Sequence, residues 1–180
     1  MEVLVTTDMP IDSLLNQELP AHDLIGLLAD LMLKKGLFLS TAESCTGGMI
    51  AAACTDAPGS SAWFERGFVT YSNAAKTDML GVDAALIAQH GAVSESVARA
   101  MAFGAIRHSA AQVSVAVTGV AGPTGGSAAK PVGTVWFGWS VCGSLHSETM
   151  CFSGNRASVR QATVNHAISK LLSLLDKVAE

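Results

Sequence analysis

A serine at position 44 stands in the first of three polar segments that could perform chemistry. The segment Glu-Ser-Cys-Thr-Gly-Gly, residues 43–48, follows a predicted strand at residues 37–43 and opens a predicted helix over residues 45–55. A helix N-terminus offers unpaired amides and a partial positive charge, and the two glycines would let it lie close to a ligand. Ser44 is therefore a candidate nucleophile beside an oxyanion or phosphate site, or it is simply the cap of the helix.

The second segment supplies a candidate base, Lys76, which lies four residues after Ser72 and five after Tyr71. A lysine activates a hydroxyl only when neutral, so its pKa of about 10.4 would have to fall to about 7, at a cost of about 4 kcal/mol. Burial and nearby cations lower a lysine pKa in this way; the alternative is a solvated lysine on a helix. Ser72 is a rival nucleophile or the cap of that helix. Tyr71 could hydrogen-bond the nucleophile, relay a proton or only end a strand.

The third segment is the glycine-rich loop from Gly119 to Lys130, which follows a predicted apolar strand. Successive amides in such a loop can form an anion-binding nest, although a purely structural loop is the alternative. It is not a Walker A loop, because Gly126 is not followed by Lys and then Ser or Thr, and it does not fit the dinucleotide-binding fingerprint. Arg156 and Arg160, near the start of the last predicted helix, oppose the helix dipole. A bound anion would explain them; otherwise they are surface arginines.

The order of the elements predicts an α/β fold, a single layered domain with a mixed β-sheet flanked by helices. Strands and helices alternate first, and a hairpin comes late, with strands over residues 133–142 and 145–152. Gly143 and Ser144 fit a two-residue turn between them. Ligands of open α/β sheets bind beyond the carboxyl ends of the strands, so the three polar segments should converge at that edge.

Bulk properties narrow the range of partners. The net charge of -4 argues against nucleic acid as a partner. No apolar run approaches the ~18 residues of a membrane helix, and no secretory signal is visible, so we expect a cytoplasmic protein with no membrane partner. Without a CxxC pair or histidines at metal-ligand spacing, we expect no metal and no other cofactor. The hydrophobic content of 49% favours a homo-oligomer. We assign residues 21–180 to the domain and residues 1–20 to an N-terminal arm.

Seven short segments, taken together in their order and spacing, are more specific than any one glycine motif. They are AESCTGG at 42–48, YSNAAK at 71–76, LGV at 80–82, GAVS at 91–94, TGVAGPTGG at 118–126, KPVGTV at 130–135 and FSGNR at 152–156. In these segments, over roughly residues 22–176, the sequence resembles the CinA C-terminal domain family. No CinA N-terminal domain is recognised, so the chain looks like the stand-alone form.

The resemblance implies nicotinamide-nucleotide amidase activity: nicotinamide mononucleotide and water would give nicotinate mononucleotide and ammonia, without a metal. It implies Ser44 as the nucleophile with Lys76 and Tyr71 as activating partners, and it places Thr118 and Arg156 near the ligand. The other expected substrate-binding residues lie in the two glycine segments, namely Cys45, Thr46, Gly47, Gly48, Gly119, Gly122, Gly125 and Gly126. The alternatives are a catalytically silent nucleotide-binding or competence- or DNA-damage-associated module, and a hydrolase of a different amide or phosphorylated substrate.

Overall fold

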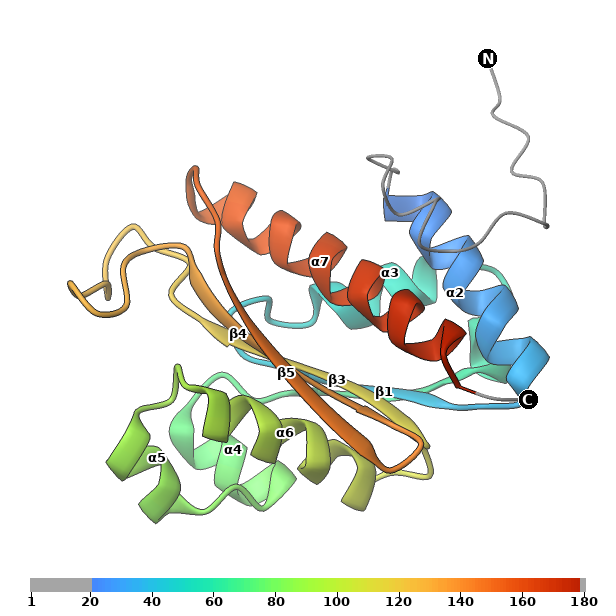
Figure 1. Ribbon diagram of the computed structural model, residues 1–180, viewed down its shortest axis with the longest axis horizontal. Coiled ribbons are helices and arrows are strands. Elements are labelled where there is room, and N and C mark those ends of the chain that lie inside the picture. Colours follow the sequence, from blue (N-terminus) through green and yellow to red (C-terminus); the bar gives the residue numbers. More distant parts are fainter. Residues whose placement is uncertain (1–20, 179–180) are drawn as a thin grey trace.

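Five strands form one mixed sheet in the computed structural model, which describes residues 21–178 (Figure 1). The spatial order is β2-β1-β3-β4-β5; β1, β2 and β3 run parallel, and β4 and β5 are each antiparallel to the strand before them. The predicted α/β fold with a mixed sheet is confirmed, while the predicted arm at residues 1–20 lies outside the described residues. The strands are β1 (Leu39–Glu43), β2 (Phe64–Val69), β3 (Val113–Gly119), β4 (Thr134–Val141) and β5 (Ser144–Cys151).

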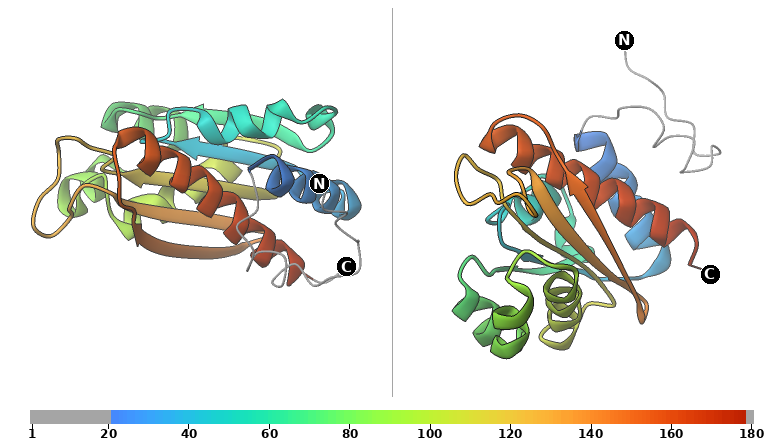
Figure 2. Two further views of the ribbon diagram at one scale, coloured as in Figure 1. Left: turned by 90° about the horizontal axis from the view of Figure 1, so that it is seen from above. Right: turned by 60° about the vertical axis from the view of Figure 1, so that its left-hand side comes forward.

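Helices cover both faces of the sheet. α2, α3 and α7 lie on one face, and α4, α5 and α6 lie on the other (Figures 1 and 2). No helix between residues 21 and 178 is both long and apolar enough to cross a membrane. The helices are α2 (Ala21–Lys35), α3 (Met49–Asp56), α4 (Asn73–Leu80), α5 (Ala84–His90), α6 (Glu95–Arg107) and α7 (Arg156–Asp176), with a short 3-10 turn at Ser60–Ala62.

Alternation along β3 divides the core between the two faces. Val113, Val115 and Val117 pack in the cluster that also contains the buried residues of α2 and α7. Ala116 belongs instead to the cluster on the α6 side. Ser114 faces the same way as Ala116, and its hydroxyl donates to a carbonyl oxygen of α6, that of Ala102, at 2.7 Å. Each buried valine stabilises the fold by about 1.5 kcal/mol or more, so β3 is fixed as a central strand.

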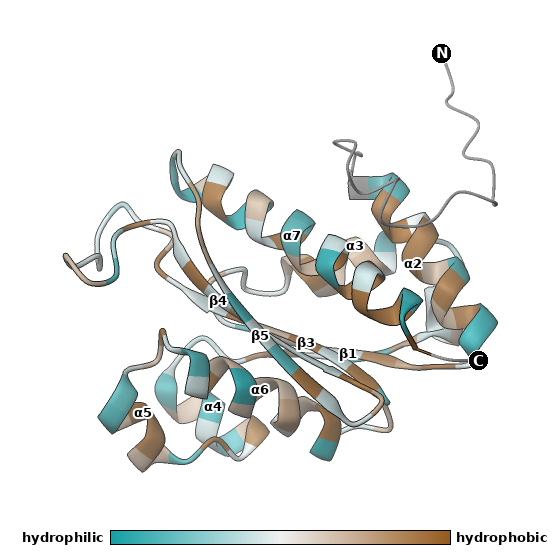
Figure 3. Ribbon diagram, in the orientation of Figure 1, coloured by the Kyte–Doolittle hydropathy of each residue, from teal (hydrophilic) through white to brown (hydrophobic). Residues whose placement is uncertain are grey.

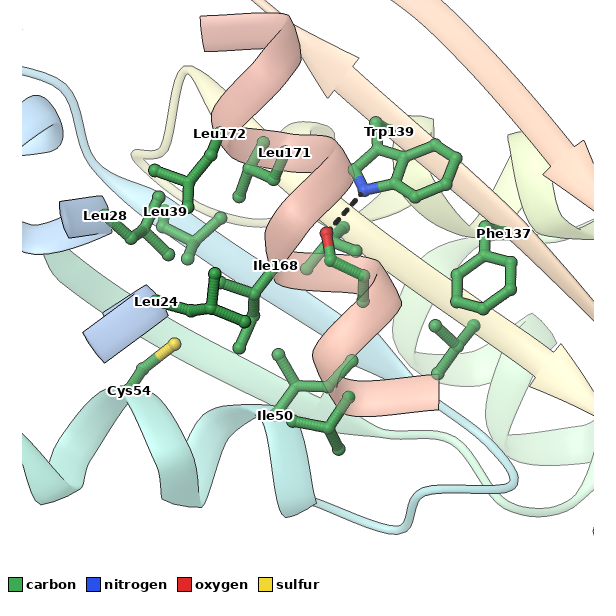
Figure 4. Packing of buried hydrophobic residues seen from close by; sticks show 14 of the residues in the cluster. Leu24, Leu28, Leu39, Ile50, Cys54, Phe137, Trp139, Ile168, Leu171 and Leu172 are labelled. Carbon is green, nitrogen blue, oxygen red and sulfur yellow. Dashed lines mark hydrogen bonds between the residues drawn. The ribbon is translucent and has the colours of Figure 1, made fainter. Parts of the chain in front are cut away.

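The larger cluster holds α7 firmly against the sheet (Figure 4). Leu24 and Leu28 of α2 pack there with Leu172 of α7, and all three are almost fully buried. α2 is hydrophobic in its middle and hydrophilic at both ends (Figure 3). On β4, the indole N–H of Trp139 donates to the carbonyl oxygen of Ala167 in α7 at 3.0 Å. These contacts fix the position of α7 on the sheet, and its N-terminal part lies towards the carboxyl end of β1 (Figure 1).

The β4–β5 hairpin turns at Cys142 and Gly143, one residue earlier than the predicted turn at Gly143 and Ser144. Both turn residues have positive φ, 48° at Cys142 and 88° at Gly143, as a type I′ turn requires. Ser144 is already paired with Val141 in the ladder. The prediction was wrong because a cysteine with positive φ is uncommon, so the sequence favoured the glycine–serine pair.

Candidate active site

Ser44 lies directly after β1, in a five-residue turn that joins the strand to α3. Its amide donates to the carbonyl oxygen of Val117 at 3.0 Å, and the Gly47 amide donates to the carbonyl oxygen of Ser44 at 3.1 Å. The predicted helix start at residue 45 is wrong, because α3 begins at Met49. Both glycines of the turn have positive φ, and Gly48, not Ser44, occupies the cap position. The hydroxyl of Ser44 is thus free of a capping role.

The buried carboxylate of Glu43 occupies the N-terminus of α3. Its Oε2 accepts from the amides of Gly48 and Ile50, both at 3.0 Å, and its Oε1 accepts from the amide of Ala51 at 2.8 Å. The hydroxyl of Thr46 also donates to Oε2, at 2.7 Å. The predicted anion site at this helix start is therefore filled by the protein's own charge. Glu43 was not among the predicted site residues, although an acid near a helix start is a usable signal.

Lys76 reaches Ser44 from α4. Its Nζ lies 3.1 Å from Ser44 Oγ and donates to the carbonyl oxygen of Thr70 at 2.9 Å. The side chain is 1% exposed, so the alternative of a solvated helix lysine is wrong. Ser72 is the cap of α4, since its Oγ accepts from the amide of Ala75 at 3.0 Å. The residue predicted as base and the residue predicted as nucleophile are therefore in contact, and the rival serine has a structural role.

The surroundings of Lys76 favour its neutral form. Burial lowers the pKa of Lys76, and the neighbouring Cys45 only partly opposes this. Within residues 21–178 no carboxylate forms an ion pair with the amine. Burial raises the pKa of the Cys45 thiol to about 11, so this neighbour stays uncharged near neutral pH. A lysine whose pKa is lowered can act as the adjacent base that activates a serine hydroxyl.

Arg156, the first residue of α7, connects two of the predicted segments. Its Nη2 donates to the hydroxyl oxygen of Tyr71 and its Nη1 to the carbonyl oxygen of Gly122, both at 3.0 Å. Tyr71 is 61% exposed. Among the described contacts, its hydroxyl bonds to Arg156 and not to Ser44 or Lys76. The structure thus brings Tyr71, Gly122 and Arg156 together.

Arg160 is a second arginine of the site, and it contacts the serine turn directly. Its Nε donates to the carbonyl oxygen of Cys45 at 3.1 Å, and its Nη2 donates to that of Thr46 at 2.7 Å. The sequence analysis treated Arg160 only as a candidate anion binder or a surface arginine. No sequence signal identifies it, because its partners are backbone carbonyl groups that any residue type would offer.

The remaining predicted residues have mixed surroundings. The hydroxyl of Thr118 is buried and donates to the carbonyl oxygen of Ala92 at 2.9 Å. Cys45 and Thr46 are both buried, so their side chains do not face solvent. In the third segment, Gly119 ends β3, whereas the other three glycines lie in the loop that follows it. Those loop residues are Gly122, Gly125 and Gly126.

Three parallel strands thus end at one edge, and a buried serine–lysine pair lies there with two arginines beside it. This defines an α/β domain with a candidate nucleophile site at the carboxyl ends of its strands. The model of the CinA C-terminal domain matches residues 21–175. The chain therefore belongs to the CinA C-terminal domain family.

Individual relatives agree with this assignment. A Pseudomonas putida protein named nicotinamide-nucleotide amidohydrolase PncC is 57% identical over 136 residues, which are 76% of this chain and 85% of that protein. The Escherichia coli K12 protein of the same name is 52% identical over 138 residues, which are 76% of this chain and 84% of that protein. The solved structure of a Klebsiella pneumoniae protein, named competence damage-inducible protein A, matches with a TM-score of 0.87 and 37% identity. That match covers 89% of this chain and all of the other.

Proposed function

We propose that this protein hydrolyses the side-chain amide of nicotinamide mononucleotide, giving nicotinate mononucleotide and ammonia. The observation that carries the proposal is the buried 3.1 Å contact between Lys76 Nζ and Ser44 Oγ. Relatives at 52% and 57% identity bear the name nicotinamide-nucleotide amidohydrolase. An amide is a poorly reactive carbonyl compound, and splitting its hydrolysis into two steps at an activated serine makes each step easier.

In the first step, neutral Lys76 accepts the proton of the Ser44 hydroxyl while Oγ attacks the carboxamide carbon. The new C–O bond forms as the carbonyl π electrons move to oxygen, which gives a tetrahedral oxyanion. The carbonyl oxygen of Thr70 accepts one N–H of the amine at 2.9 Å. This bond fixes the rotation of the amino group, so its lone pair can be directed at Ser44.

In the second step, the C–N bond breaks and the Lys76 ammonium donates its proton to the leaving nitrogen, which departs as ammonia. The product left on Ser44 is an ester. Water then attacks this ester with Lys76 again as base, and the proton returns to Ser44 Oγ when nicotinate mononucleotide leaves. Serine and lysine end as they began, so one amide and one water are consumed in each cycle.

The phosphate of the nucleotide is assigned to Arg156 and to amides of the glycine loop beside it. The guanidinium already contacts this loop through Gly122 at 3.0 Å. Because Glu43 accepts from three amides at the N-terminus of α3, its negative charge disfavours phosphate there. Tyr71 remains a predicted activating partner; its hydroxyl is bonded to Arg156, so it would link the phosphate group to the catalytic pair.

The deciding experiment measures ammonia release from nicotinamide mononucleotide by the purified protein, with Ser44→Ala prepared in parallel. We expect stoichiometric ammonia and nicotinate mononucleotide from the parent and almost none from the variant. Equal release by both proteins would point to a contaminating amidase. No release by the parent would reject the proposal in favour of a silent nucleotide-binding or competence-associated module, and release from a different amide would favour another hydrolase.

A further inference from the structure

Two carbonyl groups of the turn that carries Ser44 are bonded to one side chain, that of Arg160. The guanidinium donates to two consecutive carbonyl groups, those of Cys45 at 3.1 Å and Thr46 at 2.7 Å. More than a hundred residues separate the partners along the chain. A Cβ added at Gly47 would lie 3.7 Å from Arg160 Nη2, so the guanidinium also lies next to Gly47.

The turn is also bonded to Glu43, whose carboxylate accepts from the Thr46 hydroxyl at 2.7 Å and from the Gly48 amide at 3.0 Å. It contains two consecutive glycines with positive φ, Gly47 at 60° and Gly48 at 99°, and glycine is the residue with the greatest backbone freedom. On the strand side the Ser44 amide is bonded to Val117, and within the turn Gly47 is bonded back to Ser44. These bonds involve other groups of the turn, whereas the carbonyl oxygens of Cys45 and Thr46 are bonded to Arg160.

Arg160 itself is presented from a rigid support. It lies on α7 next to Val159, which is fully buried, and close to the buried Val164. The planar, forked guanidinium suits two acceptors at once, whereas an ammonium group acts as a single point charge. The hydrogen bonds of Lys76 go to Ser44 and Thr70, and those of Arg160 go to the carbonyl oxygens of Cys45 and Thr46, so the arginine acts through the backbone of the turn.

We propose that Arg160 is a positioning residue that keeps Ser44 Oγ on Lys76 by bracing the backbone of residues 45 and 46. The inference rests on the proposed role of Ser44 as nucleophile. Removing the brace lets the glycine turn relax and moves the hydroxyl away from the amine. Misplacement of a reacting group by about 1 Å lowers a rate by about 10²-fold, and this loss falls on kcat and not on the binding of substrate.

The test compares Arg160→Met with Arg156→Met, which alters an arginine one turn away on the same helix. We expect Arg160→Met to lower kcat about 10²-fold with KM within about 3-fold, and Arg160→Lys to recover only part of the loss because it cannot brace both carbonyl groups. Arg156→Met should show the opposite division, with its main effect on KM. A normal kcat in Arg160→Met would overturn the proposal.

A crystal structure of the variant gives an answer that does not depend on activity. We expect the contact between Ser44 Oγ and Lys76 Nζ to lengthen beyond hydrogen-bonding distance, and an unchanged contact would overturn the proposal even if the parent released no ammonia. Absence of ammonia release from the parent would instead refute the proposed function alone. If Arg160→Met does not fold, the same measurements on Arg160→Lys decide the matter.

Discussion

The amine of Lys76 and the hydroxyl of Ser44 lie 3.1 Å apart, although 32 residues separate them in the sequence. Ser44 follows β1, and Lys76 lies on the helix that follows β2, the parallel neighbour of β1. The pair is buried, and the lysine has no acidic partner among residues 21–178. In the proposed mechanism Lys76 is the proton acceptor and Ser44 is the nucleophile, and three of the predictions below follow from this pair.

Ser44→Ala should lower turnover by at least ~10³-fold while substrate still binds, because it removes the nucleophile from a unit that acts together. The measurement is kcat for ammonia release, with binding of nicotinamide mononucleotide followed by calorimetry. Ser72→Ala is the matched control, since Ser72 caps α4. It should cost about 1 kcal/mol of stability and leave turnover nearly unchanged. Activity retained in Ser44→Ala but lost in Ser72→Ala would exchange the two roles.

The rate should rise with pH through the pKa of Lys76. Burial lowers this pKa, and the active form is the neutral amine, so kcat/KM should be low in acid and level off below the ordinary lysine value of about 10.4. Lys76→Arg should keep the positive charge yet lose activity, because arginine stays protonated. An active arginine variant with an unchanged pH profile would show that position 76 serves only as a fixed cation.

The same pKa shift should appear in the pH dependence of stability. The unfolded chain holds the lysine proton up to about pH 10.4, whereas folded Lys76 releases it at lower pH. The unfolded state therefore binds more protons in this window, and the free energy of unfolding should rise with pH by up to about 1.4 kcal/mol per unit. Lys76→Met lacks this contribution. Urea unfolding of both proteins between pH 7 and 10 tests it, and parallel curves would contradict a lowered pKa.

The pairing of Ser44 with Lys76 could be expected from the sequence, because both residues follow parallel strands whose carboxyl ends meet at one edge. The hydrophobic alternation of β3 likewise predicted a buried strand. The start of α3 could not be predicted in the same way. In the sequence, the glycines at 47 and 48 indicated only a backbone that could lie close to a ligand. Both have left-handed backbone in the structure, and α3 begins after them, at Met49.

Glu43 and Arg160 escaped prediction for a common physical reason. Each bonds mainly to backbone groups of the serine turn and the helix after it. Every residue type offers a backbone carbonyl, and every type except proline offers an amide, so the sequence does not indicate these partners. The partner of Tyr71 was equally hidden, since a hydroxyl that could reach several groups turns to Arg156. Only the three-dimensional arrangement identifies such contacts.

Glu43→Gln should destabilise the fold by about 2 to 4 kcal/mol. The carboxylate accepts four hydrogen bonds, and an amide would place a donor against one of the donors and weaken the rest. Urea unfolding at neutral pH measures the loss. Glu65→Gln is a control at a surface ion pair with Arg66, where about 0 to 1 kcal/mol is expected. Similar values for the two variants would mean that Glu43 does not cap α3 in solution.

Arg156→Ala should weaken binding of the nucleotide, because its guanidinium is assigned to the phosphate. Charge-assisted hydrogen bonds of this kind contribute about 1.5 to 3 kcal/mol, or roughly 10- to 150-fold in binding, so KM should rise by about that factor. The experiment compares parent and variant on nicotinamide mononucleotide and on nicotinamide riboside, which lacks the phosphate. The riboside should be a poor substrate for the parent and should lose little more on mutation.

Tyr71→Phe, which removes the hydroxyl that Arg156 contacts at 3.0 Å, distinguishes the role of Tyr71 from that of Arg156. If Tyr71 activates the serine, this variant loses kcat on both substrates, and if it only orients Arg156, it resembles Arg156→Ala. An equal loss on nucleotide and riboside in Arg156→Ala would remove Arg156 from phosphate recognition.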